Sequence, residues 1–262
     1  MITISPILEF YITNVCNLTC RGCNRFNNYN FKGHQYWADH ALAIEAWSKR
    51  LDAPFISILG GEPVLNPDIE SWVSNLRRLW PDSEIMIQTN GTYKNYDCSV
   101  FWKKYKVSTT ASIHDPESSE DLKKKYNTTI NATVFHQSAI IEKNDSYTLH
   151  QSDVDYAFSC CDMKHDHTIF NGKLWKCPSM ALLPEFDKQF NLQLDSRQRE
   201  LLYKFQSLNA DCSEEELERF ITTKDTPIAQ CEFCPTDLKY HTALGELKEN
   251  LPKPIYFVDS KQ

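Results

Sequence analysis

Short β-branched runs alternate with helical stretches along the first 150 residues, and this alternation constrains the fold more than any other feature. The predicted strands cover residues 7–13, 55–59, 84–88, 107–112 and 130–135, and the predicted helices cover 37–51, 68–80, 99–105 and 119–126. Alternation of this kind predicts a parallel sheet that is closed wholly or partly into a barrel. About five or six such units fit before residue 150, which is too few for an eightfold barrel.

The pattern changes after residue 155. The pair Asn171-Gly172, between short runs at 167–170 and 173–176, is a strong signal for a two-residue hairpin. Two further helices are predicted at 196–208 and 213–222, and the second opens with a capping-box spacing of Ser213 and Glu216. We therefore predict an α/β chain in two parts, residues 1–155 and residues 156–262, of which the second is a small α+β extension.

Composition excludes several classes of protein. The 262 residues carry a net charge of −7, so no basic stripe is available for nucleic-acid phosphates. No apolar run approaches the length of a membrane span, and residues 1–10 lack the features of a secretory signal. The expected location is cytoplasmic. Ten cysteines in a reducing compartment indicate metal binding or redox chemistry.

Three of these cysteines, Cys16, Cys20 and Cys23, lie on one short segment directly after the first predicted strand. Three thiolates on one loop can hold three corners of a cubane iron–sulfur cluster, which leaves the fourth iron open to a substrate or cofactor. Zinc is the alternative metal, but it favours two pairs of ligands with tetrahedral closure. Disulfides fit less well, because three adjacent thiols cannot all pair locally.

The spacing Cys-x3-Cys-x2-Cys after a first strand resembles the hallmark of the radical S-adenosylmethionine (SAM) superfamily. This resemblance implies a partial (β/α)6 TIM-type barrel in which Cys16, Cys20 and Cys23 hold a 4Fe–4S cluster that binds SAM. The family usually has an aromatic residue before the third cysteine, where this chain has Gly22. Because the family contacts adenine there partly through the backbone, Gly22 is an expected SAM contact.

A second motif, Gly60-Gly61-Glu62-Pro63, follows the apolar run 55–59 and resembles the family's motif at the end of the second strand. A carboxylate there can accept a hydrogen bond from the α-ammonium group of SAM, and adjacent glycines let the backbone approach the ligand. Taken alone, the same four residues are an ordinary turn. Similar SAM contacts in the family imply roles for two residues at the ends of the third and fourth strands, Asn90 and Ser112, for which a turn residue and a strand-end hydroxyl are the alternative.

A second group of cysteines lies beyond residue 155. Cys161 and Cys177 lie on either side of Asn171-Gly172, and Cys231 and Cys234 form a closely spaced pair. Two ligands from the hairpin and two from the pair complete a closed metal site. Ligand count alone leaves zinc as an alternative.

The order Cys161, Gly172, Cys177 and a later Cys-x2-Cys resembles the twitch domain, the short form of the SPASM extension found on some radical SAM enzymes. The resemblance implies a radical SAM partial barrel over residues 1–155 and a twitch-like domain over 156–262, which holds an auxiliary 4Fe–4S cluster. Cys160 is a competing ligand beside Cys161. Cys98 and Cys212 are interpreted as small packed hydrophobic residues.

The resemblance also implies a reaction. The family cleaves SAM to a 5′-deoxyadenosyl radical, which removes a hydrogen atom from the substrate. A closed second cluster suits an electron acceptor, so we expect a dehydrogenase-like oxidoreductase. In size and cysteine layout the chain is similar to family members that oxidise a secondary alcohol of an aminocyclitol.

Two other functions stay open. One is a peptide-modifying maturase of the same superfamily, although few residues precede Cys16 to form a peptide-binding domain. The other, from a different class, is a non-catalytic iron–sulfur or zinc module for electron transfer, which has no use for a carboxylate aimed at an ammonium group. The expected partners are a small-molecule or peptide substrate and a reductant such as flavodoxin or ferredoxin, with no nucleic acid and no membrane.

Overall fold

The computed structural model describes residues 1–20, 22–29, 31–91, 99–113, 129–132, 138–144 and 146–236. Its strands are β1 (Ile2–Thr3), β2 (Ile7–Tyr11), β3 (Leu51–Asp52), β4 (Phe55–Leu59), β5 (Glu84–Thr89), β6 (Ser108–Ile113), β7 (Thr129–Ala132), β8 (Ile140–Lys143), β9 (Ser146–Leu149), β10 (Asp166–Phe170) and β11 (Lys173–Trp175). Its α-helices are α1 (Trp37–Ser48), α2 (Ile69–Leu79), α3 (Ser99–Tyr105), α5 (Val154–Ser159), α6 (Pro178–Phe190), α7 (Ser196–Lys204) and α8 (Glu214–Thr222), and short 3-10 helices include η2 (Pro63–Leu65) and η4 (Ala229–Phe233). The predicted helix 119–126 and residues 133–135 of the last predicted strand lie outside the described residues.

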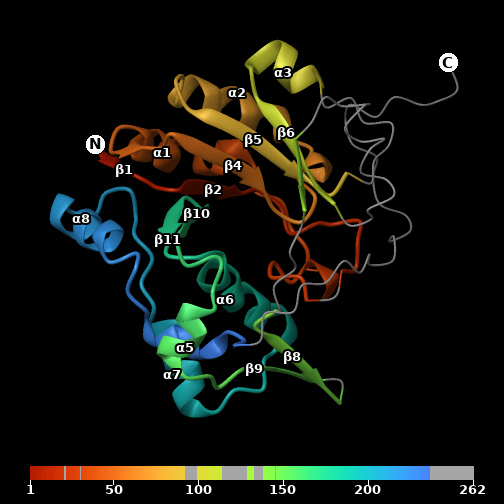
Figure 1. Ribbon diagram of the computed structural model, residues 1–262, viewed down its shortest axis with the longest axis vertical. Coiled ribbons are helices and arrows are strands. Elements are labelled where there is room, and N and C mark those ends of the chain that lie inside the picture. Colours follow the sequence, from red (N-terminus) through yellow and green to blue (C-terminus); the bar gives the residue numbers. More distant parts are fainter. Residues whose placement is uncertain are drawn as a thin grey trace, which may run out of the picture.

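A seven-stranded sheet organises the molecule (Figure 1). Its order is β11-β10-β2-β4-β5-β6-β7, and all neighbouring pairs are parallel except β10 with β11. The parallel α/β sheet is therefore confirmed. Within the described residues the edge strands β7 and β11 do not pair with each other, so the sheet is open rather than a closed barrel.

The sixth parallel strand of this sheet comes from a part of the sequence later than the strand pattern indicated. Five parallel strands, β2 and β4 to β7, precede residue 150, and the next strands form the separate antiparallel hairpin β8–β9. Strand β10 supplies the sixth, beside β2. The predicted hairpin is confirmed, because Asn171 and Gly172 have φ of 52° and 71°, the left-handed pair that a tight turn between β10 and β11 requires.

The two faces of the sheet differ in chemistry because successive side chains of a strand point to opposite sides. On the face covered by α1, α2 and α3, residues such as Phe10, Ile58 and Ile87 are buried with Trp47 and Trp72 of the helices. On the opposite face, polar side chains such as Ser57 interrupt the apolar strands. The sheet therefore has one sealed face and one polar face.

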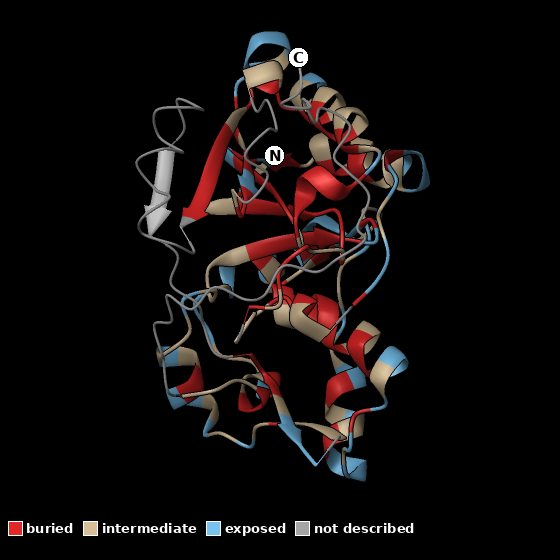
Figure 2. Ribbon diagram, turned by 90° about the vertical axis from the view of Figure 1, so that its right-hand side faces the viewer, coloured by how far each residue is buried: buried red, intermediate tan, exposed pale blue. Residues whose placement is uncertain are grey.

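A second apolar core lies against α6, below the sheet in Figure 1. Phe186 of α6 is fully buried and makes edge-on contacts with Phe26, Tyr29 and Tyr147. Phe26 and Tyr29 follow the cysteine segment after β2, so this core fixes that segment against the C-terminal helices. Figure 2 shows the buried residues on the sheet and on the helix sides that face it.

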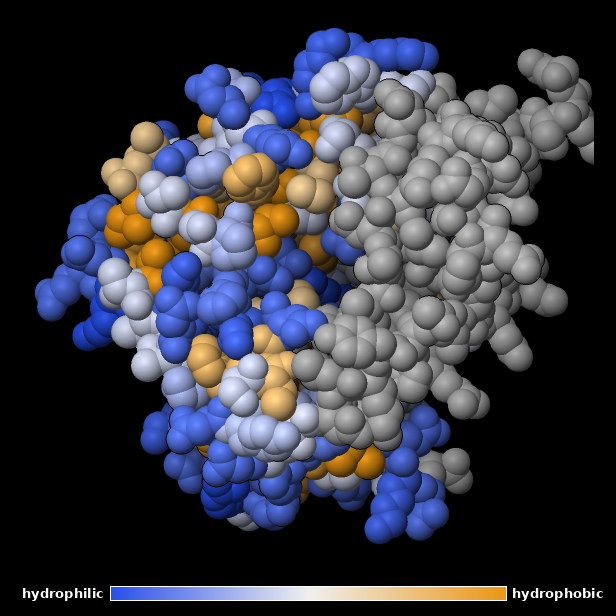
Figure 3. Space-filling model, viewed as in Figure 1, coloured by the Kyte–Doolittle hydropathy of each residue, from blue (hydrophilic) through white to orange (hydrophobic). Residues whose placement is uncertain are grey.

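On the face seen in Figure 3, hydrophilic residues surround smaller hydrophobic patches. Among the described residues, no helix combines the length and the apolar character that crossing a membrane would require.

Candidate functional site

The three cysteines of the first group line one cavity of about 450 Å³ at the carboxyl ends of the parallel strands. They are carried by the loop that leaves β2. Asn27 anchors this loop, because its side-chain amide donates to the backbone oxygen of Asn14 at 2.7 Å and to the Tyr11 hydroxyl at 3.1 Å. Parallel α/β sheets bind ligands at this edge of the sheet.

The electrostatics of the cavity suit a cationic group held by thiolates. Burial, the nearby Glu62 carboxylate and the thiols of Cys23 and Cys20 together raise the pKa of Cys16 to about 12, against a backbone hydrogen bond from Leu18. The contributions that raise the pKa come from unfavourable burial or crowding of negative charge, which an iron–sulfur cluster would offset on binding. The donor set therefore fits a cluster with three cysteine ligands.

The backbone packs so closely at Gly60 and Gly61 that neither position has space for a side chain. A Cβ at Gly60 would lie 2.5 Å from the backbone oxygen of Thr13, and one at Gly61 would lie 2.3 Å from that of Val15. The Gly61 N–H donates to Thr13 O at 2.7 Å, and the Glu62 N–H donates to Val15 O at 2.8 Å. The glycine motif thus holds the backbone that leads directly into Cys16.

Glu62 is completely buried and already bound to neighbouring residues. Its carboxylate accepts from the Thr89 hydroxyl and from the Asn90 N–H, both at 2.7 Å, and it caps η2 through the N–H of Val64. Burial raises the pKa of Glu62 to about 7, although these three donors oppose the shift. In this arrangement the carboxylate fixes the turn after β5.

The other predicted SAM contacts fall into two groups. Gly60, Gly61, Asn90 and Ser112 line the cavity, whereas Gly22, Glu62 and Pro63 are not part of its lining. The Asn90 side-chain amide lies 3.8 Å from Cys16 Sγ and donates to Asn17 Oδ1 at 2.7 Å. Gly22 has φ of 69°, a left-handed conformation that glycine adopts without strain.

Sequence reasoning missed the polar wall of the cavity. Side chains on the polar face of the sheet form it with one residue of the cysteine loop: Glu9, Ser57, Gln88, Asp166 and Arg25. Arg25 Nη2 lies 2.7 Å from Glu9 Oε1, and both side chains are buried. A single charged residue inside the apolar run 7–13 was the signal that could have identified Glu9.

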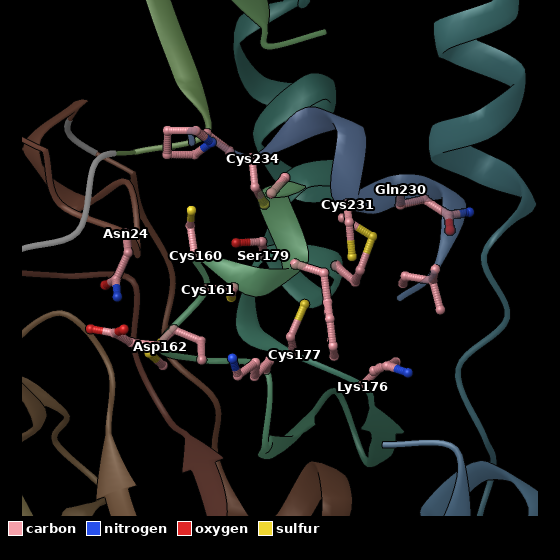
Figure 4. Close-up of a pocket in the computed structure, with 18 residues that line it drawn as sticks. Asn24, Cys160, Cys161, Asp162, Lys176, Cys177, Ser179, Gln230, Cys231 and Cys234 are labelled. Atoms are coloured by element: carbon pink, nitrogen blue, oxygen red, sulfur yellow. The ribbon is translucent and has the colours of Figure 1, made fainter. Parts of the chain in front are cut away.

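The second cysteine group borders another cavity, shown in Figure 4. Three different elements deliver its thiols. Cys161 follows the C-cap of α5, Cys177 is the N-cap residue of α6, and η4 carries Cys231 with Cys234 directly after it. Ser152 ties α5 to η4, since its N–H and hydroxyl donate to the backbone oxygens of Glu232 and Cys234, both at 2.8 Å.

Cys160 and Cys161 both line this cavity but have different surroundings. Burial raises the pKa of Cys234 well above its ordinary value, and the thiols of Cys177, Cys161 and Cys231 add to the shift. Burial likewise raises the pKa of Cys161 to about 11, with Cys231 contributing. Cys160 is not among the groups that shift either pKa, and its thiol lies 3.8 Å from the Ser159 hydroxyl at the end of α5.

The two cavities share a wall. Asn24, from the first cysteine loop, and Met163, from the turn after α5, line both of them. None of the nine described cysteines forms a disulfide, and within the described part of the chain no three His, Cys, Asp or Glu side chains converge tightly enough to hold one metal ion. Cys98 lies outside the described residues. Cys212 packs beside the main core, as predicted, and accepts from Arg50 Nη1 at 3.4 Å.

Comparison with known proteins supports the interpretation of the first site. Residues 10–133, which include the first cysteine group and the Gly60–Pro63 motif, match the radical SAM superfamily. Residues 10–133 therefore form a radical SAM domain, a family that implies SAM and a 4Fe–4S cluster as cofactors. Among solved structures, the chain is similar to BtrN in complex with AdoMet and 2-DOIA, with 13% identity, a TM-score of 0.45, and coverage of 93% of this chain and 100% of that one. No curated protein matches the chain.

Proposed function

We propose that this protein is a radical SAM oxidoreductase that removes a hydrogen atom from a small-molecule substrate and transfers an electron to an auxiliary 4Fe–4S cluster. The observation that carries this proposal is the shared wall of Asn24 and Met163, because it joins the cavity of the first cysteine group to the cavity that the second group borders. Bound SAM and its cluster would supply the 5′-deoxyadenosyl radical.

The first site has a distinct task for each group of residues. Cys16, Cys20 and Cys23 hold the cluster by three corners, so that one iron is left for SAM. Gly60 and Gly61 bring the strand-end backbone to the cavity edge and fix the entry to the cysteine loop. Asn90 and Ser112 present polar groups to SAM from the ends of β5 and β6.

The second site fits a cluster better than zinc. Zinc binds four sulfurs at about 2.3 Å each, which leaves no space between them. Here the cysteines border a cavity of about 70 Å³. A single water needs only about 10–15 Å³ on this kind of measure, so the space exceeds what one ion would fill. We assign Cys161, Cys177, Cys231 and Cys234 as its ligands.

The proposed arrangement assigns residues 1–155 to the radical SAM domain and residues 156–262 to a twitch-like domain. Strands β10 and β11 of the second part nevertheless continue the sheet of the first, so the two parts share a single sheet. A reductant such as flavodoxin or ferredoxin would supply the electron for SAM cleavage. A second cluster could accept an electron from the substrate radical, which favours oxidation of the substrate. The simplest such oxidation converts a secondary alcohol to a ketone.

Anaerobic reconstitution tests this proposal. Wild-type protein is expected to bind about eight iron atoms, since each cubane carries about four, and to form 5′-deoxyadenosine from SAM and dithionite. Replacing Cys16, Cys20 and Cys23 together with Ala should remove about half of the iron and all SAM cleavage. An iron-loaded wild-type protein that forms no 5′-deoxyadenosine would instead be an electron-transfer module.

The class of substrate is tested next, with aminocyclitols and other secondary alcohols in one set of reactions and peptides in another. Loss of two mass units from an alcohol supports the proposed oxidation. Modification of a peptide alone would favour the maturase function. Zinc in the second site after strictly anaerobic preparation would contradict the auxiliary cluster.

A further inference from the structure

Two carboxylates from distant parts of the sequence lie on the cavity wall through the pairing of β2 with β10. In this parallel pair Thr168 lies opposite Glu9, and Asp166 lies opposite Ile7. Asp166 and Thr168 are two residues apart on β10, so their side chains point to the same face of the sheet. Thr168 lies opposite Glu9, and Asp166 therefore shares the polar face with Glu9. Both line the cavity that also contains the first cysteine group.

Both carboxylate oxygens of Glu9 accept hydrogen bonds from other residues of the protein. One of its oxygens accepts from Arg25 Nη2 at 2.7 Å, and the other accepts from the Thr168 hydroxyl at 3.0 Å. Glu9 is only 4% exposed and Arg25 only 8%. This buried ion pair is a fixed element of the wall, because breaking it would leave an unpaired buried charge.

Asp166 and Arg25 each retain unused hydrogen-bonding capacity. Within the described residues, the Asp166 carboxylate accepts no hydrogen bond, and Arg25 Nη1 is a buried donor without a partner. A buried donor left unpaired is unfavourable, so the site is incomplete without a ligand that accepts from it. An unused donor beside an unused acceptor is complementary to a hydroxyl group, which can both accept and donate.

We propose that Asp166 is the proton acceptor for the oxidation and that Arg25 Nη1 and the Asp166 carboxylate together hold the substrate hydroxyl. The proposal rests on the proposed function. Loss of a hydrogen atom from the carbon bearing this hydroxyl leaves a carbon radical. The O–H proton then passes to Asp166, and the remaining unpaired electron passes to the auxiliary 4Fe–4S cluster, which is reduced by one electron. The C–O bond becomes a carbonyl, so protons and electrons balance.

The charged surroundings of Asp166 suit this task. Burial, the Glu9 carboxylate and Asp162 together raise the pKa of Asp166 to about 7, and Arg25 opposes the shift. The adjacent His165 has its ring Nδ1 at 2.8 Å from Asp225 Oδ1. A general base is most effective when its pKa lies near the working pH, because it can then both accept and release the proton.

The first test needs no substrate. A carboxyl whose pKa is higher in the folded state than in the unfolded state binds its proton more tightly when folded. The stability it contributes is complete at low pH and is lost as the pH rises through the folded pKa. We therefore expect the wild-type Tm, relative to that of Asp166→Asn, to fall between pH 5 and pH 8 in reconstituted protein. The control Asp52→Asn makes the same change of charge at an exposed position and should follow the wild type. Parallel curves for wild type and Asp166→Asn would overturn the proposal.

The second test uses an alcohol that the wild type oxidises. Asp166→Asn should still form 5′-deoxyadenosine and transfer deuterium from the labelled carbon of that alcohol, but ketone formation should fall about a hundredfold or more. Asp166→Glu should restore part of it. Ketone formation by Asp166→Asn at the wild-type rate and pH profile would contradict the proton-acceptor role. Failure of the wild type to oxidise any alcohol contradicts the proposed function instead, and the Tm curves then still decide whether Asp166 holds a proton near neutral pH.

Discussion

Glu62 is the residue whose structural role differs most from the role that its motif suggests. Its carboxylate accepts from Thr89 and from the Asn90 N–H inside the protein. In Glu62→Gln one of the two oxygens becomes an NH2 donor, so one buried donor of the turn loses its acceptor. We expect a loss of about 1–3 kcal/mol in the free energy of unfolding, which denaturant titration measures.

The control for this change is Glu84→Gln, because Glu84 is exposed at the start of β5. It should leave stability within about 0.5 kcal/mol of the wild type. If Glu62→Gln keeps wild-type stability while SAM affinity falls at least tenfold in calorimetry, Glu62 contacts SAM directly and its role in the turn is secondary.

Cys160 and Cys161 provide a matched pair of adjacent residues. The pKa of Cys161 responds to Cys231, and that of Cys234 responds to Cys161, whereas Cys160 lines the same cavity and its thiol lies 3.8 Å from the Ser159 hydroxyl. We predict that Cys161→Ser lowers bound iron and sulfide by about one cluster's content, about four of each, while Cys160→Ser retains both. Equal loss in the two variants, or loss in Cys160→Ser alone, would reverse the assignment.

At the scale of elements, the β10–β11 hairpin connects the main sheet to the second site, because Cys177 follows β11 directly before α6. Gly172 has φ of 71°, and a Cβ there would lie 3.1 Å from Ala43 Cβ of α1. Its backbone oxygen also accepts from the Trp47 indole at 3.0 Å. Gly172→Ala should therefore destabilise the protein by about 1–2 kcal/mol from backbone strain alone.

Thermal or denaturant unfolding measures this loss, and Asn171→Gly is its control, because glycine accepts the left-handed conformation at that position without strain. Asn171→Gly should cost only a few tenths of a kcal/mol. Gly172→Ala at wild-type stability would show that the turn accepts a Cβ at this position without strain.

The elements predicted from sequence share a strong local signal. β4 has the predicted bounds because its apolar run is short and continuous, and the hairpin follows from Asn171-Gly172. Helix α6 was not predicted, since Pro178 and Pro184 interrupt its pattern. Pro178 stands in the first turn, where no N–H is needed, and Phe186 and its aromatic neighbours stabilise the helix around Pro184.

The candidate sites were predictable to the extent that their residues are adjacent in sequence. The first cysteine group and the Gly60–Pro63 motif are local patterns, and both lie at the cavity edge or directly behind it. The polar wall of the cavity has no local sequence pattern, because Glu9, Arg25 and Asp166 come from separate parts of the chain. It exists only because β10 pairs with β2, which joins positions 159 residues apart such as Thr168 and Glu9. Pairing between such distant strands leaves no periodicity in the sequence.

At the scale of the whole molecule, the second cysteine site joins three segments of the C-terminal half. The double replacement of Cys231 and Cys234 with Ala should leave SAM cleavage largely intact and abolish the oxidised product, because the substrate radical would have no electron acceptor. Parallel assays of 5′-deoxyadenosine and product measure this uncoupling.

Thermal unfolding supplies the control for that variant, since metal binding across distant segments also contributes to folding. The replacement should lower Tm, but the protein should remain folded through its two apolar cores. A folded variant that still releases oxidised product would show that the second site has only a structural role.

Helix α6 begins at the second site, and this geometry has an energetic consequence for a cluster bound there. The N-terminus of a helix carries partial positive charge, and Cys177 occupies it. The buried ammonium of Lys176 lies beside it, held by the backbone oxygens of Thr223 and Thr226 at 2.7 and 2.6 Å. Positive surroundings favour the more negative, reduced form of an iron–sulfur cluster and raise its midpoint potential. The start of α6 would thus make a cluster at this site a better electron acceptor than it would be with its four thiolate ligands alone.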